Sequence, residues 1–153
     1  MPSDTAPCDV AIIGDNFMLP EKFATAIEAA CGAKVRLRSM TLPWPDAPME
    51  HGYATPGMAG LKEYQGDPDE ICAFVGNAEV LVTQLAPLSA TMLDRLPALK
   101  LVAVSRGGPV NIDMAAARAR RARGEHAGAQ CERGGRIRHR GHSGRNPHDP
   151  RRA

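Results

Sequence analysis

The stretch LKLVAVSRGGPVNID, residues 99–113, decides the fold of this chain. Its first part, residues 99–104, is apolar apart from Lys100, which is typical of a parallel strand covered on both faces. The glycines and polar residues that follow predict a tight loop, and a helix is expected to begin near Ile112. A strand that leads through a short loop into a helix is the repeating unit of parallel α/β sheets.

The loop in this stretch has the composition of an anion-binding loop. Gly107 and Gly108 allow the main chain to approach a ligand closely, and the guanidinium of Arg106 can hold a carboxylate or phosphate with two hydrogen bonds. Asn111 or Asp113 is expected to cap the helix that follows. Because α/β sheets bind ligands at the carboxyl ends of their strands, the loop is a candidate site. A plain strand-to-helix turn is the alternative interpretation.

Alternating strands and helices precede this stretch. Strands are expected at residues 10–14, 34–40 and 79–85, and helices at 19–32, from Pro68, from a cap at Ser89, and from Ile112 to about Arg118. The alternating segment 34–40 predicts an edge strand with one wet face. The connection 42–66 is rich in turns, with a short helix expected at 58–64 and with Trp44 and Tyr53 expected to cover an edge of the core.

Charge divides the chain into two parts. Residues 1–117 carry 8 Lys and Arg against 14 acidic residues, whereas residues 118–153 carry 11 Arg against 3 acidic residues. The net charge of +2 therefore hides an acidic body and a strongly basic tail. The sequence predicts a folded domain over residues 1–118 and a disordered Arg/Gly/His-rich tail over residues 119–153.

The cysteines and the first residues of the chain indicate the cellular compartment of the protein. The four cysteines are scattered and form no C-x-x-C pair, so neither a zinc site nor a disulfide framework is expected. The polar N-terminus does not resemble a signal peptide, and no apolar run approaches about 20 residues. A cytoplasmic protein with no membrane partner is expected.

Several motifs of residues 79–118 resemble the substrate-binding domain of the D-isomer-specific 2-hydroxyacid dehydrogenases. Residues 80–82, 93–100, 106–108 and 111–113 occur in the order of that family's strand, helix end, glycine loop and Asn-Ile-Asp helix start. The resemblance extends weakly over residues 8–118. It implies a flavodoxin-like parallel sheet with helices on both faces, a small 2-hydroxy or 2-keto acid as ligand, and homodimers of the intact family members.

The resemblance also implies roles for individual residues. Family members hold the substrate carboxylate partly with main-chain amides of the glycine loop, which here corresponds to Gly107 and Gly108 with Arg106 beside them. This loop is one residue shorter than the commoner family form. Asn16 and Phe17, at the end of the first strand, are expected to line the same site.

The sequence departs from the family in its cofactor motif. The family uses NAD, but the fingerprint G-x-G-x-x-G followed by an acidic residue is absent from the chain. The family's catalytic Arg, Glu and His belong to downstream segments that have no counterpart here. The chain alone is therefore predicted to bind no NAD and to be inactive, and no catalytic, cofactor-binding or metal-binding residue is assigned.

The basic tail has two interpretations. It resembles a disordered arm that binds nucleic acid, and this would make the protein a non-enzymatic α/β binding module; its lack of aromatic residues disfavours that interpretation. Alternatively, GC-rich codons for residues 119–153, read one base out of frame, can encode RGVPVANTPGRNASAVAEF and a further apolar helix. Since that is what the family has next, we expect a frameshift near residues 118–120 and an early stop, which leaves the chain truncated.

Overall fold

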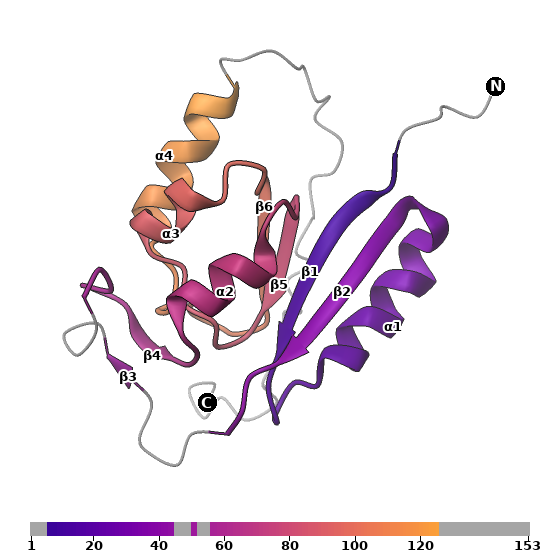
Figure 1. Ribbon diagram of the computed structural model, residues 1–153, viewed down its shortest axis with the longest axis horizontal. Coiled ribbons are helices and arrows are strands. Elements are labelled where there is room, and N and C mark those ends of the chain that lie inside the picture. Colours follow the sequence, from indigo (N-terminus) through magenta and orange to yellow (C-terminus); the bar gives the residue numbers. More distant parts are fainter. Residues whose placement is uncertain (1–5, 45–49, 52–55, 126–153) are drawn as a thin grey trace, which may run out of the picture.

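The computed structural model describes residues 6–44, 50–51 and 56–125. Strands and helices alternate along most of the chain (Figure 1). The strands are β1 (Cys8–Gly14), β2 (Val35–Thr41), β3 (Glu50–His51), β4 (Lys62–Tyr64), β5 (Val80–Thr83) and β6 (Leu101–Val104). The helices are α1 (Pro20–Cys31), α2 (Pro68–Val75), α3 (Ala90–Arg95) and α4 (Met114–Glu125), and a short 3-10 turn (Gly32–Lys34) joins α1 to β2.

Four parallel strands form the main sheet in the order β2-β1-β5-β6. β1 pairs with β2 along its whole length, from Cys8 opposite Val35 to Gly14 opposite Thr41. β2 is an edge strand, as the alternating pattern of residues 34–40 predicted. The predicted α/β fold with a parallel sheet is therefore confirmed.

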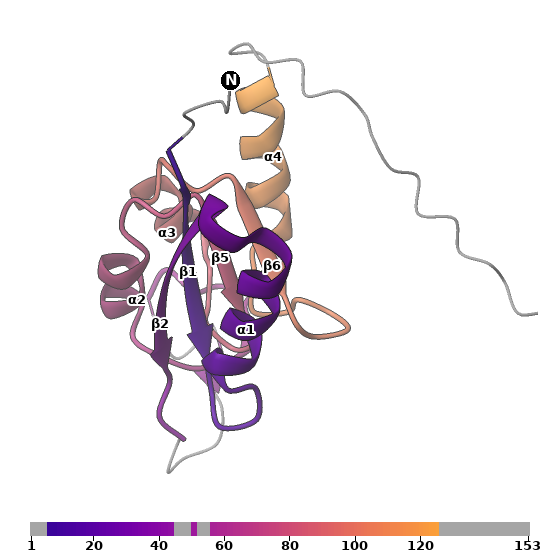
Figure 2. The same cartoon turned by 90° about the vertical axis from the view of Figure 1, so that its right-hand side faces the viewer.

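Helices cover both faces of this sheet. Figure 2 shows α1 on one side and α2 and α3 on the other. Neighbouring residues of β1 serve the two faces: Ile13 belongs to the main core with Leu81 and Ile71, whereas Ile12 is buried outside that cluster. Each such side chain, fully buried, contributes roughly 1.5–3 kcal/mol relative to an exposed one.

Local capping fixes where the later helices begin. Asp67 Oδ1 accepts hydrogen bonds from the N–H groups of Asp69 and Glu70 at 2.9 and 3.0 Å, so α2 begins at the predicted Pro68. Ser89 caps α3 as expected, and its hydroxyl accepts from the N–H of Met92 at 3.3 Å. Both caps act within three residues of sequence; the sequence predicted Ser89 as a cap but not Asp67.

The helix expected at residues 58–64 is wrong. This segment forms a turn followed by β4, which pairs antiparallel with β3. Gly57 and Gly60 adopt φ values of +79° and +84°, which are incompatible with a continuous right-handed helix. The side chains of Met58 and Tyr64 are nevertheless buried, since the turn and the strand fold back over the main core.

The expectation that residues 99–104 are covered on both faces is also wrong. Val102 and Val104 pack against the main core, but Leu101 is 56% exposed and Ala103 is exposed as well. β6 forms the edge of the sheet farthest from β2, and α1 makes its strand contacts with β1 and β2. One face of β6 therefore has no helix over it within the described residues.

α4 continues past the helix end expected near Arg118. Ala116 and Ala117 pack against the main core, and α4 lies beside α3 (Figure 1). The guanidinium of Arg120 donates hydrogen bonds to the carbonyl oxygens of Leu93 and Leu96, which satisfies the carboxyl end of α3. Alanine and arginine favour helices, so this segment extends to Glu125 despite its weak apolar pattern.

Other expectations fall outside the described residues. These include Tyr53 and residues 126–153, which make up most of the predicted tail. Within the part of the chain that the structure describes, no helix is long and apolar enough to cross a lipid bilayer.

Candidate functional site

The loops after β1, β5 and β6 lie at one edge of the sheet, because parallel strands end on the same side. From β1 the chain crosses to β2 on one side, and it later returns to place β5 on the other. The strand order therefore reverses between β1 and β5. Ligands of open α/β sheets bind at such a reversal, beyond the carboxyl ends of the strands.

The loop after β1 is a tight turn built by Asp15. Its Oδ1 accepts hydrogen bonds from the N–H groups of Phe17 and Met18, both at 2.8 Å, and its own N–H donates to the carbonyl of Met18 at 3.0 Å. Asp15 is 1% exposed, whereas Asn16 and Phe17 project into solvent. Asp15 was not among the predicted site residues, although Gly-Asp-Asn is a recognisable turn sequence.

Two exposed aromatic side chains meet near this turn. The ring centroids of Phe17 and Trp44 are 4.6 Å apart, with an interplanar angle of 69°, which is an edge-to-face contact. Phe17 is 65% exposed and Trp44 is 50% exposed. Trp44 thus packs on an exposed ring and remains half exposed, rather than being buried over a core edge as expected.

The loop after β6 presents main-chain donors to solvent. The N–H of Ser105 continues the sheet by donating to the carbonyl of Thr83 at 3.0 Å. The next three N–H groups, of Arg106, Gly107 and Gly108, meet no acceptor among the described residues. Both glycines are exposed, and a Cβ on either would have no heavy atom within 4 Å. Their amides are therefore open to a ligand.

The side chain of Arg106 is engaged by a residue that the sequence analysis missed. Its Nη2 pairs with Oε2 of Glu63, and its Nη1 donates to the Glu63 carbonyl oxygen at 3.2 Å. The Arg106 side chain is 20% exposed, and that of Glu63 is 49% exposed. These residues are 43 positions apart, so no local pattern marks the pair.

Asn111 holds the loops after β5 and β6 together. Its side-chain amide donates to the carbonyl oxygens of Gln84 at 3.2 Å and Ala86 at 2.8 Å, and Asn111 is fully buried. Of the two residues expected to cap the last helix, Asn111 does not do so. Asp113 fills that role, because its Oδ1 accepts from the N–H of Ala116 at 2.9 Å.

The predicted site residues fall into two groups at this edge. Arg106, Gly107 and Gly108 share the loop after β6, whereas Asn16 and Phe17 lie on the loop after β1, with β5 between the two strands. Among the described residues, no hydrogen bond joins one group to the other.

No family model, curated protein or solved structure matches the chain.

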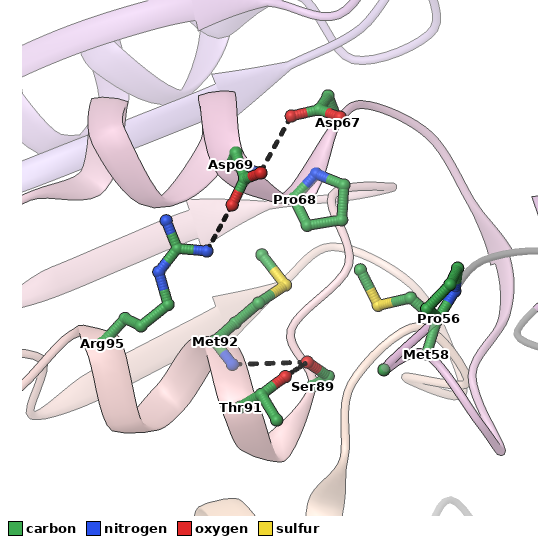
Figure 3. A pocket seen from close by; sticks show the side chains of 10 residues that line it. Pro56, Met58, Asp67, Pro68, Asp69, Ser89, Thr91, Met92 and Arg95 are labelled. Carbon is green, nitrogen blue, oxygen red and sulfur yellow. Dashed lines mark hydrogen bonds and ion pairs between the residues drawn. The ribbon is translucent and has the colours of Figure 1, made fainter.

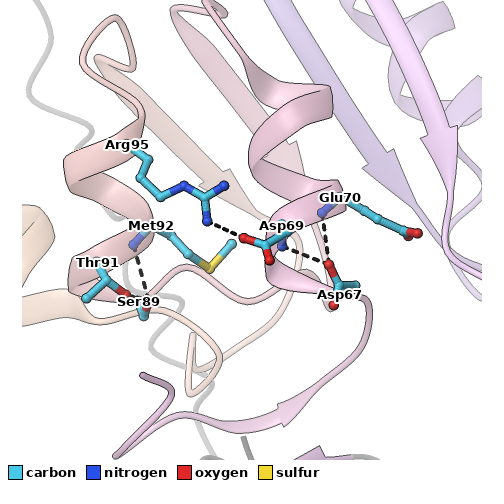
Figure 4. A network of polar contacts seen from close by, with 7 residues as sticks. All are labelled: Asp67, Asp69, Glu70, Ser89, Thr91, Met92 and Arg95. Carbon is cyan, nitrogen blue, oxygen red and sulfur yellow. Dashed lines mark hydrogen bonds and ion pairs between the residues drawn. The ribbon is translucent and has the colours of Figure 1, made fainter. Parts of the chain in front are cut away.

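A separate cavity of about 240 Å³ lies between α2 and α3 (Figure 3). None of the predicted site residues lines it. Its polar side chains already bind one another: Arg95 pairs with Asp69 at 2.5 Å, and Ser89 shares a hydrogen bond with Thr91 at 2.9 Å (Figure 4). The hydrogen bond to Asp69 raises the pKa of Arg95. The lining residues are Pro56, Gly57, Met58, Asp67, Pro68, Asp69, Ser89, Thr91, Met92 and Arg95.

Metal-binding side chains do not gather in the described part of the chain. No group of three or more His, Cys, Asp or Glu residues there could hold a metal ion.

Cys72 on α2 is expected to react slowly in the folded protein. Burial raises its pKa, which the charge of Arg95 partly offsets and that of Asp69 reinforces. Above about pH 8.5 the unfolded thiol loses its proton, whereas the native thiol keeps it. The free energy of unfolding should therefore fall as pH rises above this value.

We expect iodoacetamide to alkylate Cys72 at least about tenfold more slowly than the half-exposed Cys31, as measured by peptide mapping. Equal rates in the folded protein would contradict this.

Proposed function

We propose that this chain is the substrate-binding domain of an NAD-dependent D-2-hydroxyacid dehydrogenase, and that it binds the carboxylate of a small 2-hydroxy or 2-keto acid. One observation carries the proposal. Three consecutive main-chain N–H groups, those of residues 106–108, meet no acceptor among the described residues, and they lie at the carboxyl edge of a parallel sheet in the loop that carries the Arg106 guanidinium. The motif order that resembles the dehydrogenase family supports the choice of ligand.

The chemistry of the loop suits a carboxylate. Main-chain N–H groups of a turn can donate to an anion, and each charge-assisted hydrogen bond contributes roughly 1.5–3 kcal/mol. The open space beside Gly107 and Gly108 leaves room for the ligand. The guanidinium of Arg106, which is paired with Glu63, supplies a positive charge on the same loop.

The residues present do not fit the dinucleotide cofactor. The turn that follows β1 has a single glycine beside it, Gly14 at the end of the strand, and the turn is closed by Asp15 rather than left open for a pyrophosphate. At Gly14 itself, a Cβ would lie 2.5 Å from the ring of Pro20, so the turn is tightly filled. We therefore assign substrate binding to this chain and derive no hydride transfer from its residues.

Titration of the ¹⁵N-labelled full chain with pyruvate tests the proposal. Saturable shifts of the Gly107 and Gly108 amide resonances are expected. Arg106→Gln should weaken binding about tenfold, the effect of one charge-assisted hydrogen bond. Arg36→Gln is the matched control. It removes the same charge from β2, at the other edge of the sheet, where exposed Arg36 pairs with Asp9 of β1.

Two results would overturn this proposal. One is the absence of shifts at both glycines at millimolar pyruvate. The other is an affinity of the Arg106→Gln variant that equals the affinities of the wild type and of the Arg36→Gln control.

No hydride transfer is assigned to this chain. The absorbance of added NADH should therefore stay constant in the presence of the full chain and pyruvate.

A further inference from the structure

Glu63 has an unusual backbone conformation. Its φ is +52°, and it is the only non-glycine residue with a positive φ among the described residues. Side chains disfavour this left-handed region, and glutamate has no short side chain that compensates locally, as asparagine or aspartate has. Such strain persists only where surrounding contacts hold the residue, and it concentrates at functional sites.

Main-chain hydrogen bonds on both sides hold Glu63 over the candidate site. The N–H of Lys62 donates to the carbonyl of Val110 at 2.9 Å, and the N–H of Gln65 donates to the carbonyl of Leu85 at 3.0 Å. The segment 62–65 therefore bridges the loops after β6 and β5. Glu63 lies between its two anchor points.

Glu63 also takes both terminal nitrogens of the Arg106 guanidinium. One nitrogen binds its carboxylate and the other its carbonyl oxygen. Arg106 is four-fifths buried and thus fixed in direction, whereas the half-exposed Glu63 carboxylate can turn into solvent. The guanidinium fork is shaped for two carboxylate oxygens, and here one residue supplies both acceptors.

We propose that Glu63 is an internal competitor and specificity residue of the carboxylate site: it occupies Arg106 in the empty protein and is displaced by the carboxylate of the ligand. This inference rests on the proposed function, because it concerns the same site. The displaced Glu63 carboxylate stays on β4 next to the loop and repels further negative charge. The site therefore selects short 2-keto acids with one carboxylate over dicarboxylates.

Calorimetric titration of the full chain with pyruvate, acetate and 2-oxoglutarate tests this. Glu63→Gln should bind pyruvate about fivefold tighter than the wild type, because one competing ion pair is gone. Its gain for 2-oxoglutarate should be larger, since repulsion of the second carboxylate is also removed. Glu28→Gln, an exposed change of equal charge on α1, should bind within twofold of the wild type.

A second variant guards against misfolding. Glu63→Gly removes the carboxylate and relieves the positive φ, so it should fold and show at least the same gain as Glu63→Gln. Unchanged affinity of folded Glu63→Gln and Glu63→Gly for all three anions would overturn the inference. In that case, pyruvate-dependent shifts at Gly107 and Gly108 in the wild type would still support the proposed function.

Failure of the proposed function, with competition by Glu63 intact, would give a different result. If the wild type binds pyruvate no better than acetate and its glycine amides do not shift, recognition of 2-keto acids fails. A gain in acetate or pyruvate affinity in Glu63→Gln would then still support competition by Glu63.

Discussion

Gly14→Ala is expected to remove a large part of the stability of this protein. An alanine Cβ at this position would lie 2.5 Å from both the Cδ and the N of Pro20, and 2.6 Å from the carbonyl oxygen of Met18. These atoms belong to the backbone or a proline ring, so no side-chain rotation relieves the overlap. The turn after β1 would have to open.

Opening that turn has consequences on both sides of it. The carbonyl of Gly14 accepts the N–H of Leu42 at 2.8 Å, and Asp15 organises the residues that lead into α1. Overpacking typically costs 1–3 kcal/mol, and a clash with fixed backbone should reach about 3 kcal/mol or more. That is a large part of the 5–15 kcal/mol typical of a folded domain.

Urea unfolding followed by circular dichroism measures the effect. Gly107→Ala is the matched control, because a Cβ there has no neighbour within 4 Å. Its free energy of unfolding should lie within about 0.5 kcal/mol of that of the wild type. Equal midpoints for the two alanine variants would show that the β1 turn is not packed as described.

Asn111→Ala should lower the free energy of unfolding by about 2–4 kcal/mol. The buried amide of Asn111 is the donor for the carbonyls of Gln84 and Ala86, and alanine leaves both without it. An unsatisfied buried acceptor costs about 1–3 kcal/mol. The loops after β5 and β6 would also separate, so affinity for pyruvate should fall with stability.

Two further variants sharpen this second test. Asn111→Asp keeps the shape but places oxygen against two carbonyl oxygens, and it should destabilise at least as much as alanine. Asn77→Ala, at an exposed position after α2, should change stability by less than about 0.5 kcal/mol. A tolerated Asn111→Asp would contradict the assigned hydrogen bonds.

The sequence by itself determined the features that depend on neighbouring residues. Strand and helix periodicity predicted the α/β class and the edge position of β2. The caps Ser89 and Asp113 act within three residues of themselves, so local composition was enough to predict Ser89 and to name Asp113 as one of two candidates. The Arg106-Gly107-Gly108 loop was identified for the same reason, since its glycines and its place after a strand are adjacent in the chain.

Only the tertiary structure decided which distant residues meet. The pairing of Arg106 with Glu63, the bonds of Asn111 to the loop after β5 and the contact of Arg120 with α3 join positions 24–43 residues apart. The exposure of Leu101 follows from the strand order, which puts β6 at an edge. Local propensity constrains a few residues at a time, whereas these contacts depend on how the sheet and its loops pack together.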